Sequence, residues 1–155
     1  IEDKFVPTLS GKIIQLGSEV GGVAFAPDDE QQIAAAIEGH LENGCDLLIL
    51  SGGMSVDPDD VTRKAIRMAG ADEIHYGAAA LPGAMFLVAY IGDTPLLGAP
   101  ACGLHHRITV LDLILPRVLA GERVGKKELA FLGHGGLCMD CPECRYPHCP
   151  FGKGV

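Results

Sequence analysis

The sequence predicts an α/β domain of three layers, in which helices cover both faces of a mostly parallel β-sheet that includes a short β-hairpin. Three observations support this class. Helix-like and strand-like apolar patterns alternate along the chain. The run Asp46–Leu50, aliphatic from its second residue on, suits a parallel strand buried on both faces. Two apolar stretches, Met85–Tyr90 and Thr94–Leu97, are joined by Ile91-Gly92-Asp93, as in a hairpin.

The helices follow from periodicity and from their end signals. Phe5, Leu9 and Ile13 recur every fourth residue, which indicates one apolar helix face. Asp57 and Pro58 suit an N-cap and a first helical position. Glycine favours helix ends because it readily adopts positive φ, and Gly17, Gly44, Gly70 and Gly121 close the four predicted segments. In chain order we expect helices over 3–16, 28–43, 58–68 and 103–119, and short strands over 21–25, 46–50 and 72–76, with a linker that contains a short strand over 122–132.

Composition limits the function classes. The 155 residues fit one α/β domain over 1–121, followed by a linker and a Cys-rich tail over 122–155. A net charge of -8 with 12 Lys and Arg argues against a nucleic-acid surface, which needs clustered cations. No apolar run approaches the roughly 18–20 residues of a membrane span. Four of the six cysteines crowd the C-terminus rather than forming a dispersed disulfide framework, so we expect a cytoplasmic protein.

Three strand-to-helix junctions are candidate ligand sites, since ligands of open α/β sheets bind at the carboxyl ends of strands. They are Pro27–Asp29, Ser51–Asp60 and Gly98–His106. The second is the most informative, because Gly52 and Gly53 let the backbone approach a ligand closely. The acids that follow it either cap the next helix or contact a ligand or a divalent ion, and the residues alone leave both readings open.

The segment Ser51–Thr62 resembles the Gly-Gly loop of the molybdenum-cofactor-biosynthesis domain. This is the family of molybdopterin adenylyltransferases and molybdotransferases, with gephyrin as a eukaryotic relative. Pro27-Asp28, Leu81-Pro82-Gly83 and Leu97–Pro100 resemble further landmarks of that family in the same order. The resemblance covers roughly 5–121, and it implies the binding of molybdopterin or molybdenum cofactor during biosynthesis, insertion or delivery.

The resemblance also implies roles for individual residues. Asp28 and Asp60 would be the catalytic acids, with Mg²⁺ as a possible ion, and any enzyme activity would be adenylyl- or molybdotransferase-like. The implied cofactor-binding residues are Ser51, Gly52, Gly53, Ser55, Asp57, Thr62, Pro82, Gly83, Pro100, Cys102 and His105. The implied partners are a small phosphorylated pterin, an anaerobic molybdoenzyme and further copies of the chain.

Three features depart from the family pattern. The third junction reads Pro100-Ala101-Cys102-Gly103, where the family has Pro-Gly-Asn/Ser-Pro. Ala84 follows the Pro-Gly pair where the family has Lys or Ser, and His105 with its neighbours could compensate from a helix start. Ile1–Asp3 resembles the point just past the family's first strand and Thr-Gly loop. We therefore expect that strand to be missing and the isolated chain to bind ligand weakly.

The C-terminal cysteines indicate a metal site separate from these junctions. Cys138, Cys141, Cys144 and Cys149 are spaced by two, two and four residues and end in Cys-Pro. This spacing approaches a ferredoxin-type iron–sulfur pattern. A zinc site is the close alternative. The alternative without a metal is a disulfide-linked or disordered tail. Of the other thiols, Cys45 is expected in the core. Cys102 either lines a pocket or is a reactive thiol at a helix N-terminus.

Two other functions remain open from the sequence. The first is a metal-dependent nucleotide pyrophosphatase on the same fold, in which Asp28, Asp57 and Asp60 hold a divalent ion. The second is a non-enzymatic iron–sulfur or zinc interaction module, for which the α/β body is a scaffold.

Overall fold

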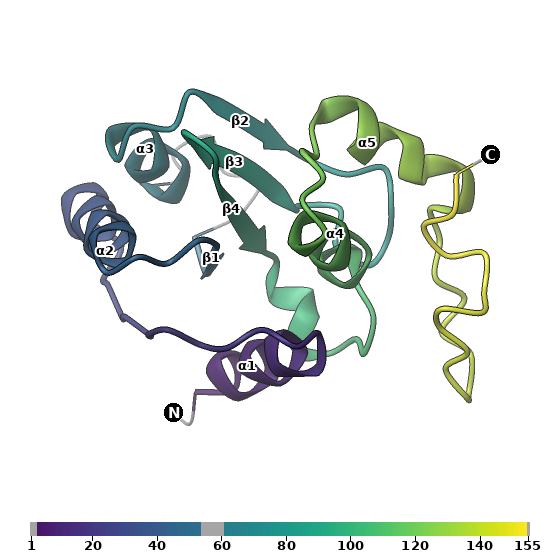
Figure 1. Cartoon of the computed structure of the whole chain (residues 1–155). Helices are drawn as coiled ribbons and strands as arrows, with labels where there is room; N and C mark the ends of the chain where they lie inside the picture. The colour runs from purple at the N-terminus through teal and green to yellow at the C-terminus, as the bar shows by residue number, and fades with distance from the viewer. Residues whose placement is uncertain (1–2, 54–60, 155) are drawn as a thin grey trace.

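The computed structural model describes residues 3–53 and 61–154 of the chain. In this part of the chain, five α-helices surround a four-stranded mixed sheet with the strand order β1-β4-β3-β2 (Figure 1). The strands are β1 (Leu48–Ser51), β2 (Glu73–Tyr76), β3 (Leu87–Ile91) and β4 (Thr94–Ala99). The α/β class predicted from the sequence is therefore observed.

The sheet contains one parallel pair, β1 with β4, in which Ser51 lies opposite Ala99. The predicted hairpin is confirmed: β3 and β4 pair antiparallel and are joined at Gly92, whose φ is 57°. β2 also pairs antiparallel with β3. The prediction of a mostly parallel sheet is thus wrong for the described strands. No α-helix separates β2, β3 and β4, and connections this short join strands only in antiparallel fashion.

Helices lie on both faces of this sheet and form the three expected layers. They are α1 (Phe5–Gln15), α2 (Glu30–Glu42), α3 (Val61–Met68), α4 (Val110–Leu119) and α5 (Lys126–Phe131). Successive strand residues point to opposite faces. On β3, Val88 therefore joins a core with α4 and α5, whereas Leu87 joins a second core with α2 and α3.

Two predicted elements are absent from the structure. Residues 21–25 form no strand but an exposed segment that lines the same cavity as β1. A Cβ on Gly21 or Gly22 would meet Cys45 or His40 at 3.3 and 3.1 Å, so these glycines allow the segment to lie close to α2 and β1. Residues 126–131, expected in a linker with a short strand, are α5, whose start is capped by Glu128 Oε2 accepting from the Gly125 N–H at 2.9 Å.

The predicted helix over 103–119 begins later than expected. A short 3-10 helix spans Ala101–Leu104, and α4 starts only after Thr109. Asp112 Oδ2 accepts hydrogen bonds from the Thr109 N–H at 2.7 Å and from its hydroxyl at 3.2 Å. This capping box fixes the true start of the helix. His105 and His106 therefore lie in the loop before α4 rather than in its first turn.

The Cys-rich tail is folded against the domain. Val124, Leu129, Leu132 and Phe151 belong to the same buried cluster as α4. Leu81 and Leu137 form an isolated parallel bridge. The proposed division at residue 121 stays a prediction, but the described tail shares the core of the α/β body.

Candidate functional site

The parallel pair β1 and β4 sets the position of the candidate site. Since Ser51 and Ala99 are register partners at the ends of these strands, Gly52 and Pro100 leave the sheet side by side. Gly52 and Gly53 have φ values of 91° and 60°, in the left-handed region that glycine adopts without strain. The second and third junctions predicted from the sequence are therefore neighbours at one edge.

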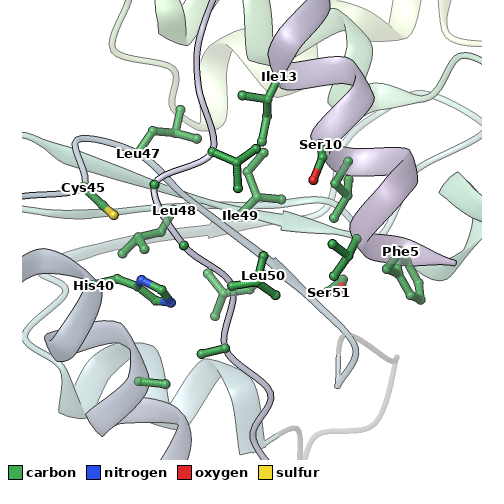
Figure 2. Close-up of a pocket in the computed structure, with 18 of the residues that line it drawn as sticks. Phe5, Ser10, Ile13, His40, Cys45, Leu47, Leu48, Ile49, Leu50 and Ser51 are labelled. Carbon is green, nitrogen blue, oxygen red and sulfur yellow. The ribbon is translucent and has the colours of Figure 1, made fainter. Parts of the chain in front are cut away.

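A cavity of about 510 Å³ opens beside β1. Its walls are α1, the exposed segment before α2, α2 itself and β1 (Figure 2). Leu47 and Ile49 belong to the core that includes α4, whereas Leu48 and Leu50 belong to the core of α2 and α3. Most of the lining is aliphatic. Polar groups line the same cavity: Ser51 and Gly52 at the carboxyl end of β1, Asp28 before α2 and Thr62 of α3.

The two acids before α2 have different roles. Asp29 is the N-cap, and its Oδ1 accepts from the Gln32 N–H at 2.9 Å. Asp28 is exposed and lines the cavity instead. The acid selected from the sequence thus lines the cavity, while its neighbour Asp29 caps the helix terminus. Thr62 is buried, at 4% exposure, in the first turn of α3.

Pro82, Gly83, Pro100 and Cys102 form a second group of predicted site residues. The Val110 N–H donates to the Pro82 carbonyl at 3.1 Å, which ties the Pro-Gly turn to the start of α4. Gly83 has φ 109° and is buried against Val110. The Gly83 backbone also lies near the Cys102 thiol and lowers its pKa. This group therefore joins the Pro-Gly turn to the loop that leaves β4.

The environment of Cys102 bears on whether its thiol is reactive. Burial raises the pKa of Cys102, and hydrogen bonds from the backbones of Cys102 and Gly83 lower it by less. The residue lies in a short 3-10 helix and not at the N-terminus of α4. The sequence argument for a thiol activated by a helix terminus is therefore wrong, and the half-buried Cys102 forms part of the wall of this edge.

Other predicted residues lie elsewhere or outside the described chain. Ser55, Asp57 and Asp60 fall between residues 54 and 60, which the structure does not describe. His105 is exposed beyond the 3-10 helix and lines neither cavity described here. His106 lines a second cavity, formed with the tail cysteines.

The sequence analysis missed several groups that line the large cavity. Ser10 of α1 points its hydroxyl towards the cavity in Figure 2, and His40 and Cys45 face it from the side of α2. Cys45 had been expected in the core, and it is half-buried and packs against the core of α2 and α3. A polar residue on the apolar face of the first helix was the readable signal for Ser10, since it lies four residues after Val6 and three before Ile13 on the same face.

The described residues hold neither a ready metal-ligand set nor a membrane-spanning helix. In residues 3–53 and 61–154, no three His, Cys, Asp or Glu side chains form a ready metal-ligand set. In the same ranges, no helix is long and apolar enough to cross a membrane.

Comparison with known proteins identifies the family. Residues 1–123 match the family model described as "Probable molybdopterin binding domain". The chain belongs to the molybdopterin-binding domain family of molybdenum-cofactor biosynthesis. The match covers the sheet, the large cavity and both groups of junction residues, and it ends before α5 and the tail. The resemblance noted from the four ordered landmarks is thereby confirmed.

Individual relatives agree with this assignment. The chain is 27% identical over 122 residues to a molybdopterin molybdenumtransferase of Synechococcus elongatus, covering 77% of the chain and 30% of that protein. A solved molybdopterin biosynthesis MoeA protein of Pyrococcus horikosii matches with 31% identity and a TM-score of 0.50, covering 64% of this chain and 24% of that one. The matched part of this chain thus spans less than a third of the length of these two relatives.

A third relative shows the same fold at a more similar length. The molybdopterin biosynthesis Mog protein of Mycobacterium ulcerans matches with a TM-score of 0.55 and 24% identity, and the match covers 77% of this chain and 87% of that protein. At this identity the likeness concerns the fold alone.

Proposed function

We propose that the chain binds molybdopterin or the molybdenum cofactor at the carboxyl edge of β1 and β4, in cofactor assembly, insertion or delivery. The observation that carries the proposal is the register of Ser51 with Ala99. It joins the Gly-Gly loop to the Pro100–Cys102 loop beside a cavity that Asp28 and Thr62 also line. Family membership supports the identity of the ligand.

The chemistry of the edge suits a phosphorylated pterin. Without side chains, Gly52 and Gly53 leave their backbone N–H groups open to phosphate oxygens. A phosphate also gains from the positive end of α3, where Thr62 lies. The Asp28 carboxylate can accept from the amino and ring N–H groups of a pterin, as carboxylates do with paired donors. The aliphatic remainder of the cavity can cover the flat face of the ring.

A transferase reaction is a more specific proposal than ligand binding, and it depends on residues that the structure does not describe. Transfer of an adenylyl group or of molybdate needs a second acid and an ion, for which Asp60 with Mg²⁺ is the candidate. Asp28 alone could orient the ligand but could not hold such an ion, because Mg²⁺ prefers an octahedral shell of several oxygens. Binding is accordingly the core of the proposal, and transferase activity its extension. The metal expected in the tail is a separate question, since it concerns other residues.

The test is an anaerobic calorimetric titration of the full-length protein with molybdopterin. We expect Asp28→Asn and Asp60→Ala each to weaken binding at least about tenfold, which corresponds to about 1.4 kcal/mol. Asp72→Asn is the matched control, because Asp72 is exposed beside β2, at the opposite end of the sheet order. Equal affinity of all four proteins would contradict the proposal. A different result would favour the nucleotide pyrophosphatase function instead. In that case the protein would release phosphate from nucleotides in the presence of a divalent ion, and Asp28→Asn would abolish this activity.

A further inference from the structure

The tail cysteines surround a second cavity, away from the large one. Cys138, Cys141, Cys144 and Cys149 all line this cavity of about 90 Å³. The cysteines are free of disulfide bonds. Cys138 and Cys149 are half-buried and pack against the main core, whereas Cys141 and Cys144 are exposed. All four tail cysteines therefore line one small cavity, which spacing along the chain alone does not establish, although their sulfurs do not form a ready ligand set in the described residues.

The tail is held in shape by the domain rather than by its own thiols. Phe151 is buried at 3% exposure, and the Gly152 N–H donates to the Gly135 carbonyl at 2.7 Å. The Tyr146 hydroxyl donates to the Asp112 carbonyl of α4 at 3.0 Å. The half-buried pair of cysteines is therefore fixed on the core side of the cavity, and the exposed pair lies on the solvent side.

We propose that this cavity is a thiolate metal centre in which all four tail cysteines are ligands. Thiolates select soft metals, and four of them form the closed shell of a structural Zn²⁺ site or the anchors of an iron–sulfur cluster. Arg107 and Arg145 line the cavity and offset the negative charge of the thiolates. In the described residues, the cysteine side chains are not arranged as a metal-ligand set. A change of χ1 rotamer at the exposed Cys141 and Cys144 can move their sulfurs inward.

The centre would also brace the edge assigned to the pterin. The Cys138 N–H donates to the Leu81 carbonyl at 2.8 Å, and Leu81 directly precedes Pro82 and Gly83. On the other wall, His106 lines the thiol cavity while its N–H donates to the Cys102 carbonyl at 3.0 Å. Metal ligation by Cys138 therefore restrains the Leu81–Gly83 turn, and a filled cavity supports the Cys102 loop through His106. The metal centre itself does not depend on pterin binding.

The experiment uses the full-length protein purified without oxygen under reducing conditions, with metal analysis and visible spectroscopy. We expect about one bound metal centre per chain. Reconstitution with Zn²⁺ alone and with iron plus sulfide decides between the two metals, and Co²⁺ serves as a spectroscopic probe of thiolate ligation. Loss of the metal should raise the hydrogen exchange of residues 81–83 and 100–108.

The test variants are Cys141→Ser and Cys144→Ser, which change exposed residues and leave the core intact. Cys45→Ala is the control, because Cys45 is a cysteine that does not line this cavity. We expect each Ser variant to weaken metal retention at least about tenfold and Cys45→Ala to keep it. The proposal is overturned if the reduced wild-type protein takes up none of the three metal preparations, or if the double Ser variant binds as the wild type does. Since pterin titration is a separate measurement, either failure leaves the assignment of the pterin edge untouched.

Discussion

Gly83 lies directly against Val110: a Cβ placed on Gly83 would come within 2.8 Å of the Val110 nitrogen. That nitrogen already donates to the Pro82 carbonyl, and Gly83 has φ 109°. Gly83→Ala therefore combines backbone strain with overpacking. We expect it to lower the free energy of unfolding by roughly 2–4 kcal/mol, measured by urea denaturation. Gly39→Ala is the control, because Gly39 lies inside α2 with open space around its Cβ position. It should raise stability by up to about 1 kcal/mol, and equal losses in both variants would contradict this account.

Tyr90 connects the sheet to the segment before α5. Its buried hydroxyl donates to the Val124 carbonyl at 3.0 Å and accepts from the Val124 N–H at 2.8 Å. Tyr90→Phe leaves both Val124 groups without a partner in a buried place. We expect a loss of about 2–3 kcal/mol, seen as a lower melting temperature in calorimetry. A loss below about 0.5 kcal/mol would show that water replaces the hydroxyl.

The same phenol makes stability depend on alkaline pH. Burial raises the pKa of Tyr90, and this effect outweighs the lowering by the Val124 hydrogen bond and by Arg123. A raised folded-state pKa means that the stabilisation is complete below the ordinary pKa of 10.0 and is lost as the pH rises through the folded value. We expect wild-type stability to fall more steeply than that of Tyr90→Phe above this pH. Parallel curves for the two proteins between neutral and strongly alkaline pH would refute the assignment.

The adjacent acids before α2 provide a test of helix capping. Asp29→Ala removes the acceptor of the Gln32 N–H, so it should cost about 1 kcal/mol of unfolding free energy. Asp28→Ala should stay within about 0.5 kcal/mol, because Asp28 is exposed and faces the cavity. Chemical denaturation of the two variants side by side gives the comparison. The reverse order of stabilities would mean that the two carboxylates exchange roles.

Short-range sequence signals predicted those elements of the fold that neighbouring residues determine. The hairpin at Gly92 and the helix after Asp29 both follow from adjacent residues. The start of α4 was also readable, because Thr109 and Asp112 have the spacing of a capping box. Strand direction was not readable, since it depends on which strands pair across the sheet. The sequence indicated a strand near β2 and the hairpin after it, but not that β2 pairs antiparallel with β3.

In the candidate site, too, residues marked by local sequence signals were predicted, whereas residues brought in by tertiary packing were not. The Gly-Gly loop and Asp28 were found because strand ends and helix starts are sequence signals. The contribution of Ser10 and His40 was missed, since the cavity forms only when α1, α2 and β1 assemble. Likewise, the spacing of the cysteines predicted a metal site, but not that His106 would line the same small cavity as the four cysteines.

Helix α1 is joined to α4 by an ion pair between Lys12 and Asp112. Lys12 Nζ donates to the Asp112 carboxylate and, at 2.9 Å, to the Arg107 carbonyl. The side chains of Lys12 and Asp112 are only 17% and 11% exposed, so this ion pair is poorly screened. A double-mutant cycle with Lys12→Met and Asp112→Asn should give a coupling energy of about 1–2 kcal/mol in denaturation experiments. Asp112→Asn alone should cost more than Lys12→Met, because Asp112 also caps α4.

The exposed pair Lys64–Glu30, at 3.3 Å between α3 and α2, is the matched control. Its side chains are 47% and 38% exposed, and such pairs contribute about 0–0.5 kcal/mol that salt screens further. The coupling of Lys12 with Asp112 should therefore persist in high salt while the control coupling vanishes. If both couplings vanish together, α1 is held mainly by its apolar contacts, among them that of Leu9 with the core.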